Sequence, residues 1–74
     1  MNKQDMLFNA ETERSHAKYF LRELKDQIAR LEAALTYEHV SHPIDKAHDI
    51  VFQAMRIEAH LVKFETLKDL ANKL

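Results

Sequence analysis

The chain of 74 residues contains no cysteine and no glycine, and its one proline is Pro43. Without cysteine it cannot form disulfides, thiolate zinc sites or a thiol nucleophile. Without glycine it has no phosphate-binding loop, dinucleotide-binding fingerprint or nucleophile elbow, because these motifs need a backbone that carries no Cβ atom. These classes of site are therefore excluded.

An excess of charge of one sign is also lacking, since eleven basic and twelve acidic residues give a net charge of −1. Such a balance creates no overall field toward nucleic acid or an anionic membrane. The apolar runs are only a few residues long, against about 20 for a membrane span. The opening residues MNKQDMLFNAE lack the cationic and apolar blocks of a signal peptide. We therefore expect a cytoplasmic protein that contacts no membrane.

The sequence predicts a single domain over residues 1–74, built from two helices that are separated near the proline. Pro43 disfavours helical backbone in the residue before it and fits the first turn of the helix after it. The residues on both sides are mostly good helix formers. We expect the first helix over about 3–39, a turn over about 40–42 and the second helix over about 43–73.

Both predicted helices carry apolar residues at alternating steps of three and four, which is the pattern of a coiled coil. We call these two rows the seams. In the first helix the seam comprises Leu7, Ala10, Ala17, Leu21, Leu24, Ile28, Leu31 and Leu35, with Arg14 as its one interruption. In the second helix it comprises Ala47, Ile50, Ala54, Ile57, Leu61, Phe64 and Ala71, interrupted by Lys68.

A turn this short makes the two helices antiparallel, so residues whose numbers sum to about 83 are expected at the same level. This register places Arg14 opposite Lys68 and Asp69, where both seams are interrupted. Two interpretations of that layer stand side by side. The end of the hairpin is frayed there, or Arg14 pairs with an acid such as Glu65 and fixes the register.

The second helix carries another row of apolar residues beside its seam, formed by Val51, Met55 and Val62. We call this row the outer stripe; Phe20 flanks the seam of the first helix. A chain this small buries little core alone, and oligomers mostly close as symmetric pairs. The predicted fold class is therefore all-α, an antiparallel two-helix hairpin that homodimerises into a four-helix bundle through Phe20 and the outer stripe. The alternative is a monomeric hairpin with an apolar edge.

Histidine is frequent, with five residues, and three of them lie near the expected turn. His39, His42, Asp45 and His48 have spacings that would let them converge on a metal. The simpler interpretation is a polar turn with Asp45 placed at the positive end of a helix dipole. No HExxH motif is present, and we expect neither a metal nor a cofactor.

Glu13-x-x-His16 and Asp45-x-x-His48 look like the carboxylate-x-x-His pairs of ferritin-like di-iron bundles. Neither pair lies on a predicted seam, whereas di-iron ligands project into the core, so a di-iron site is not expected. Ser15 lies beside a histidine, but neighbours on a helix point to different sides and form no triad. We expect no catalytic residues and no enzyme activity.

Four basic residues at steps of four, four and three form one side of the first helix: Arg14, Lys18, Arg22 and Lys25. We call them the basic stripe. Such a stripe can contact phosphates or an acidic protein. The alternative is a solvated flank in which Arg22 pairs with Asp26, four residues further on.

Two resemblances to known families accompany these patterns. A hairpin dimer that begins Met1-Asn2-Lys3-Gln4 resembles the plasmid copy-number protein Rop, which implies binding of an RNA complex by a four-helix bundle. The run Ala47-x-x-x-Val51-x-Gln53-Ala54-Met55 is similar to the second helix of phage anti-CBASS sponges, which implies an oligomer that sequesters cyclic nucleotides.

The function expected from the sequence is that of a small regulatory or inhibitory adaptor of bacterial or phage type. It would work as a homodimer and contact a protein partner through exposed apolar residues and the basic stripe. An RNA binder that uses the same stripe is the first alternative. A sponge for small anions or nucleotides at a subunit interface is the second.

Overall fold

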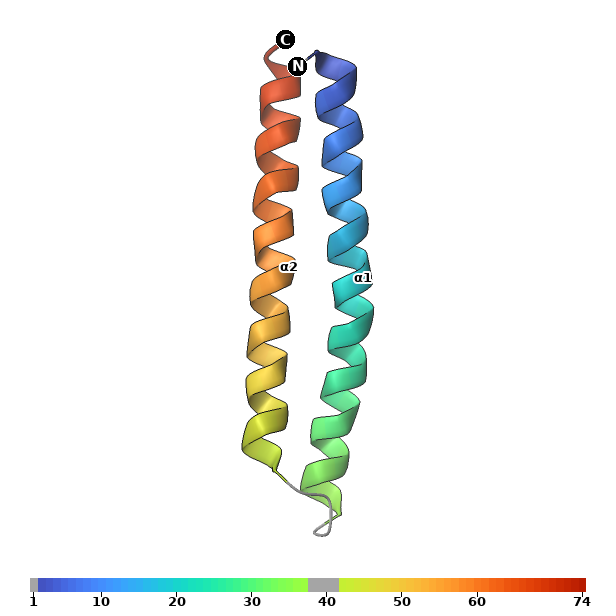
Figure 1. Cartoon of the computed structure of the whole chain (residues 1–74), viewed down its shortest axis with the longest axis vertical. Helices are drawn as coiled ribbons and strands as arrows, with labels where there is room; N and C mark the ends of the chain where they lie inside the picture. Colours follow the sequence, from blue (N-terminus) through green and yellow to red (C-terminus); the bar gives the residue numbers. More distant parts are fainter. Residues whose placement is uncertain (1, 38–41) are drawn as a thin grey trace.

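The computed structural model describes residues 2–37 and 42–74, which form two long helices. Helix α1 spans Lys3–Thr36 and helix α2 spans Pro43–Asn72. The helices run antiparallel and side by side, so that the described ends of the chain meet at one end of the molecule (Figure 1). The molecule measures 56 × 14 × 13 Å. The predicted all-α hairpin is confirmed.

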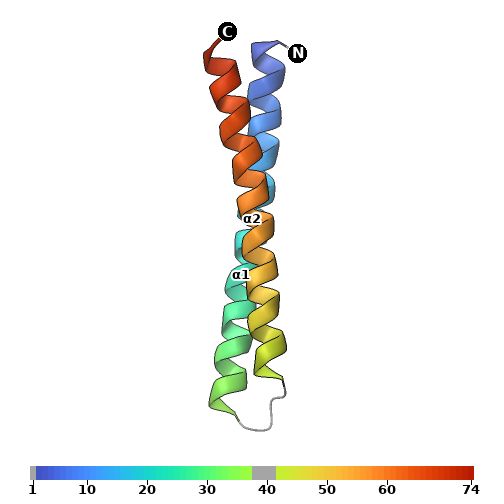
Figure 2. The same cartoon turned by 90° about the vertical axis from the view of Figure 1, so that its left-hand side faces the viewer.

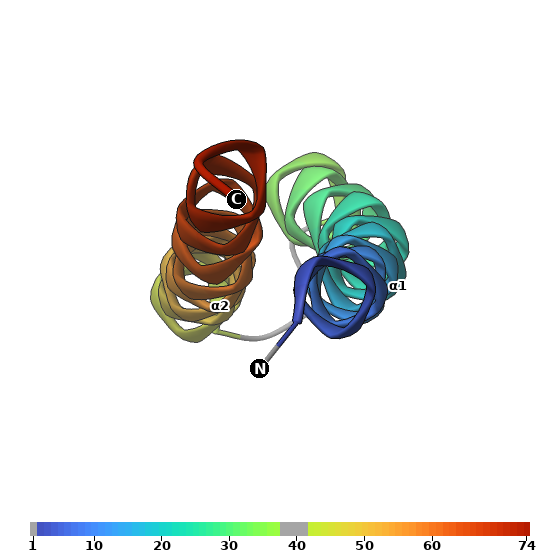
Figure 3. The same cartoon turned by 90° about the horizontal axis from the view of Figure 1, so that it is seen from above.

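The two helices contact each other along their whole length and cross at a shallow angle (Figure 2). Seen along its axis, each helix has the other on one side only (Figure 3). Neither α1 nor α2 combines the length and the apolar character that crossing a bilayer requires.

Helix α1 begins and ends at side chains that make local hydrogen bonds. Asn2 caps its start, where the side-chain Oδ1 accepts a hydrogen bond from the backbone N–H of Asp5 at 2.8 Å. At the other end the Thr36 hydroxyl donates to the carbonyl of Glu32 at 2.8 Å, and Tyr37 has extended backbone. Threonine and tyrosine are weak helix formers. The helix therefore ends earlier than predicted; positions 38 and 39 and the turn residues 40 and 41 lie outside the described residues.

Helix α2 begins at Pro43, as predicted, directly after a residue with unusual backbone. His42 has φ 65° and ψ 59°, the left-handed conformation that few residues other than glycine adopt. The proline disfavours the right-handed helical conformation there. The His42 side chain makes no capping hydrogen bond. Asp45 lies in the first turn, where a negative charge is favourable.

The core between the helices is made of small and polar side chains. The buried residues are Ala10, Ala17 and Ala34 on α1 and Gln53 and Ala71 on α2, and no large side chain is fully buried among the described residues. Alanines at a helix contact let the two backbones approach closely.

Only part of each predicted seam is buried against the other helix. The seam residues that are at least partly buried, as predicted, are Leu7, Ala10, Ala17, Leu24 and Leu31 on α1 and Ile50, Ile57, Phe64 and Ala71 on α2. On α2 the exposed seam residues are Ala47, Ala54 and Leu61. Leu21 lines a groove with Leu61 and Phe64 of α2, the residues that it was predicted to meet. Leu21, Ile28 and Leu35 are nevertheless exposed by 43%, 40% and 71%, so they are not the buried contacts that the seam predicts. Their places are taken by the residues one position earlier, Phe20, Gln27 and Ala34. Each helix is thus rotated about its axis by part of a turn.

The register also differs from the prediction. Glu13 contacts His60, whereas the predicted register placed it level with Leu70. The early end of α1 at Thr36 contributes to this difference, because it changes which residues of the two helices lie level with one another.

Candidate functional site

Three side chains of metal-binding type meet between the helices, in the half of the hairpin nearer the chain ends. Glu13 and His16 lie one turn apart on α1, and His60 reaches them from α2. The Glu13 Oε2 and His60 Nδ1 atoms are 2.5 Å apart, and the two side chains are 19% and 22% exposed. The ring centroids of His16 and His60 lie 5.1 Å apart. One ligand atom from each residue lies within 4.8 Å of the other two. We call this group the histidine cluster.

The electrostatics of the histidine cluster favour an ionised carboxylate. The hydrogen bond from His60 is the main reason that the pKa of Glu13 is lowered from its ordinary value of 4.5. Burial acts in the opposite direction, and the charges of His60, Lys63 and His16 lower the pKa further. Glu13 is thus a negatively charged acceptor in a partly buried place.

An aromatic wall holds His60 in position. The Phe20 ring stacks on the His60 ring with centroids 5.4 Å apart and an angle of 22° between the planes. Tyr19 packs edge-on against Phe20, and the Arg56 guanidinium lies 5.7 Å from the Phe20 ring and 5.1 Å from the Phe52 ring. The stacked Phe20 ring restricts the rotation of the imidazole, so its Nδ1 atom keeps its direction toward Glu13 on α1.

Two glutamines place further polar groups in the helix contact. Gln53 is 5% exposed, and its Nε2 donates to the Phe20 carbonyl at 3.2 Å. Gln27 has a buried Oε1 atom without a hydrogen-bond partner. An acceptor left in this state costs about 1–3 kcal/mol of folding free energy.

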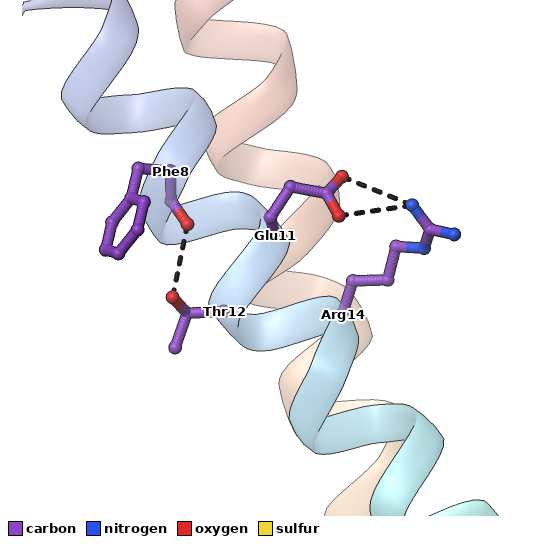
Figure 4. Close-up of polar contacts among 4 residues, drawn as sticks. All are labelled: Phe8, Glu11, Thr12 and Arg14. Carbon is purple, nitrogen blue, oxygen red and sulfur yellow. Dashed lines mark hydrogen bonds and ion pairs between the residues drawn. The ribbon is translucent and has the colours of Figure 1, made fainter.

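The basic stripe lies exposed along α1, and its ion pairs differ from those predicted. Arg14 pairs with Glu11 on its own helix, with Nη1 3.1 Å from Oε2 (Figure 4). Among the described residues Arg14 forms no ion pair with an acid of the second helix such as Glu65. Of the two interpretations of this layer, the one that pairs Arg14 across the helices was therefore wrong. In the same turn of α1 the Thr12 hydroxyl donates to the Phe8 carbonyl at 3.2 Å (Figure 4).

The rest of the basic stripe has no carboxylate partner among the described residues. Asp26 pairs with Arg30 at 3.4 Å rather than with Arg22. Over residues 2–37 and 42–74, no ion pair involves Lys18, Arg22 or Lys25. Three cations therefore follow one another along α1 and are available to an external anion.

The metal candidates near the turn do not assemble among the residues that the structure describes. His42, Asp45 and His48 form no three-residue ligand group, whereas the histidine cluster does. His39, the fourth candidate, lies outside the described residues. The His48 ring packs instead near Phe52, with centroids 6.4 Å apart.

An apolar groove runs between the helices. Its volume is about 320 Å³. The lining residues are Arg14, Ala17, Lys18 and Leu21 from α1 and Ile57, Leu61 and Phe64 from α2. Ile28 and Leu35 follow Leu21 at intervals of seven residues, so they lie on the same side of α1. This side of the hairpin is thus an exposed apolar surface with Arg14 and Lys18 at its edge.

The structure separates the four residues predicted for a dimer interface. Phe20 packs against His60 within the hairpin, as described above. Val51, Met55 and Val62 of the outer stripe are all exposed. Val62 directly follows the groove residue Leu61, and successive helix positions point about 100° apart, so the outer stripe forms a surface of its own.

Comparison of the chain with protein-family models, curated proteins and solved structures finds no match. The Rop-like and sponge-like resemblances therefore rest on the quoted residues alone, and function has to be argued from the surfaces described above.

The sequence indicates part of the histidine cluster but not its third member. The spacing of Glu13 and His16 marks them as a pair, whereas the expected register keeps His60 away from them. The residues one position before the seams form a pattern that links Glu13 to His60. Glu13, Phe20 and Gln27 on α1 and Gln53 and His60 on α2 also recur every seven residues. Together they form a polar and aromatic row beside the apolar one.

Proposed function

We propose that this chain is a non-catalytic binding protein that works as a homodimer, a four-helix bundle in which the apolar groove of each hairpin packs against the other copy. Its role is that of a small regulatory or inhibitory adaptor for a protein partner. The observation that carries the proposal is the rotation of the helices, which leaves three apolar residues of each seam exposed.

In a four-helix bundle each helix contacts two neighbours, and its seam points toward the bundle axis between them. The hairpin has this arrangement with one neighbour missing. Leu24 and Leu31 pack on the other helix, while Leu21 and Ile28 lie exposed on the groove side of α1. A second hairpin on the groove would bury the exposed residues of both seams.

The solvent-accessible area of the single hairpin is large enough to include a dimer interface of standard size. The chain exposes 5777 Å², whereas a folded monomer of 8.7 kDa exposes about 4,700 Å². The difference of about 1,100 Å² exceeds the roughly 800 Å² that each partner buries in a standard interface. Since no large side chain is fully buried among the described residues, the dimer would also supply the core that the hairpin lacks.

The surfaces left outside such a dimer are suited to a protein partner. The outer stripe offers three exposed apolar side chains, and the basic stripe offers Arg22 and Lys25 to an acidic face, with Lys18 at the edge of the groove. The groove is lined by apolar side chains and two cations, without an acid, histidine or hydroxyl group. It therefore lacks the groups of an acid–base or nucleophilic site, which supports binding rather than catalysis.

Binding of structured RNA is the alternative that a specific observation favours. Lys18, Arg22 and Lys25 follow one side of a straight helix without ion pairs among the described residues, and a dimer would double their number. Against this, the net charge of −1 limits the electrostatic contribution that dominates nucleic-acid binding.

The oligomeric state tests the proposal directly. Light scattering coupled to size-exclusion chromatography, at micromolar concentration, should give about twice the 8.7 kDa chain mass. A folded, monodisperse monomer at that concentration contradicts the bundle. Capture of partners with and without nuclease then separates the protein adaptor from the RNA binder.

A further inference from the structure

The histidine cluster is the one place in the described structure where three metal-binding side chains converge. None of its three residues lines the apolar groove, so the proposed dimer does not account for it. Two of its members, Glu13 and His60, are mostly buried, although ionisable side chains ordinarily prefer the solvated face of a helix.

The donor set is that of a transition-metal site. Two imidazoles and one carboxylate supply three protein ligands, the number that open zinc sites use, and water or another donor completes the coordination. Imidazole suits zinc, copper, iron and nickel, whereas magnesium and calcium prefer oxygen ligands throughout. The residue types therefore select a divalent transition metal over the alkaline-earth ions.

The geometry needs only small adjustments to admit such an ion. Zinc binds nitrogen and carboxylate oxygen at about 2.0–2.2 Å, which places tetrahedral donor atoms roughly 3.3 Å apart. Glu13 Oε2 and His60 Nδ1 are 2.5 Å apart because they share a hydrogen bond, and the atoms of all three residues lie within 4.8 Å. Side-chain rotation can open the first distance and close the others. The metal would replace the proton between Glu13 and His60.

The surroundings already hold the ligands in place. The Phe20 ring stacks on His60 and restricts its rotation, and the spacing of Glu13 and His16 by one turn is fixed by α1. The binding of an ion then removes less side-chain freedom, which favours affinity.

We propose that Glu13, His16 and His60 form a binding site for one divalent transition-metal ion of the zinc type. The ion links α1 to α2 at a level where the two helices otherwise share one hydrogen-bonded pair, Glu13 and His60. Because the ligands come from both helices, binding requires the folded hairpin and stabilises it.

Titration of the full chain with zinc chloride tests the site. Calorimetry should give one zinc ion per chain, and zinc, unlike magnesium chloride, should raise the melting temperature. His16→Ala should weaken zinc binding at least tenfold. His16 is exposed, so the variant should keep the parent fold. Circular dichroism checks this. His48→Ala, which removes an exposed histidine outside the cluster, should leave the affinity unchanged.

The NMR signals of the histidine rings distinguish metal binding from a purely structural role of these histidines. On addition of zinc, the signals of His16 and His60 should shift while that of His48 stays. The proposal is overturned if the parent chain binds no zinc, or if His16→Ala binds it as tightly as the parent does. It is also overturned if His48→Ala loses the binding, because the ion would then be held near the turn.

Discussion

Leu21 of α1 and Leu61 of α2 line the same groove from opposite helices, and each keeps about two fifths of its surface exposed, 43% and 40%. Leucines at heptad positions are ordinarily the most buried residues of a helix pair. Their exposure is explained if the hairpin is half of a larger bundle, and this relationship leads to the first prediction.

Leu61→Asp is expected to dissociate the dimer, and Val62→Asp is not. The first change places a charge in the proposed interface without a partner, which should raise the dissociation constant about 30-fold or more, equivalent to at least about 2 kcal/mol. Sedimentation equilibrium over a concentration series measures the effect.

The two positions are adjacent on α2, so the comparison controls for loss of helix propensity. If Val62→Asp dissociates the dimer while Leu61→Asp leaves it intact, the interface is the outer stripe, and the assignment of the groove to a second copy is wrong.

Gln27→Leu is expected to stabilise the fold. The buried Oε1 of Gln27 has no hydrogen-bond partner, and its removal recovers about 1–3 kcal/mol while adding apolar contact. Urea unfolding followed by circular dichroism should show a higher midpoint. Gln53→Leu is the matched control. It gives up the hydrogen bond to the Phe20 carbonyl, so its gain should be smaller or absent. A lower midpoint for Gln27→Leu would show that this side chain is bonded in solution.

Asn2→Ala is expected to lower the free energy of unfolding by about 1 kcal/mol. The Asn2 side chain accepts the hydrogen bond from Asp5 that caps α1, and alanine cannot replace it. Asn2→Asp keeps an acceptor at the positive end of the helix dipole and should retain the parent stability. Equal destabilisation of both variants, measured by thermal unfolding, would contradict a capping role.

The division into two helices could be predicted because its causes are local. Pro43 ends one helical stretch and begins another whatever surrounds it, and the good helix formers on both sides favour a helix without any tertiary contact. The heptad rows were also readable, since their spacing is a property of each helix alone.

The rotation of the helices could not be predicted, because two neighbouring rows on α1 are equally able to pack. Phe20 and Leu21 are both apolar, and the choice between them depends on what α2 presents. In the structure Phe20 faces His60, and Leu21 is left to the groove. That choice also brings Glu13 to His60, 47 residues away in the chain. No pattern within one helix contains such a contact.

The basic stripe yields the last prediction. Replacing Lys18 and Arg22 by glutamine should leave the fold nearly unchanged, because helix propensity barely differs and neither residue forms an ion pair among the described residues. If the chain is the proposed adaptor, the double variant should no longer bind its protein partner, and binding by the parent should weaken as salt is raised. Capture from lysate with nuclease present, repeated at two salt concentrations, measures both effects.

Lys46→Gln together with Lys73→Gln removes the same charge elsewhere on the chain and serves as the matched control. If the stripe binds phosphates instead, the parent binds structured RNA, and the Lys18 and Arg22 double variant flattens the salt dependence by about one unit of slope for each phosphate that is no longer neutralised. If both double variants keep every partner at the parent affinity, the stripe is a solvated flank. The surface that binds a partner would then have to be the outer stripe, whose three exposed apolar side chains need no charge to bind.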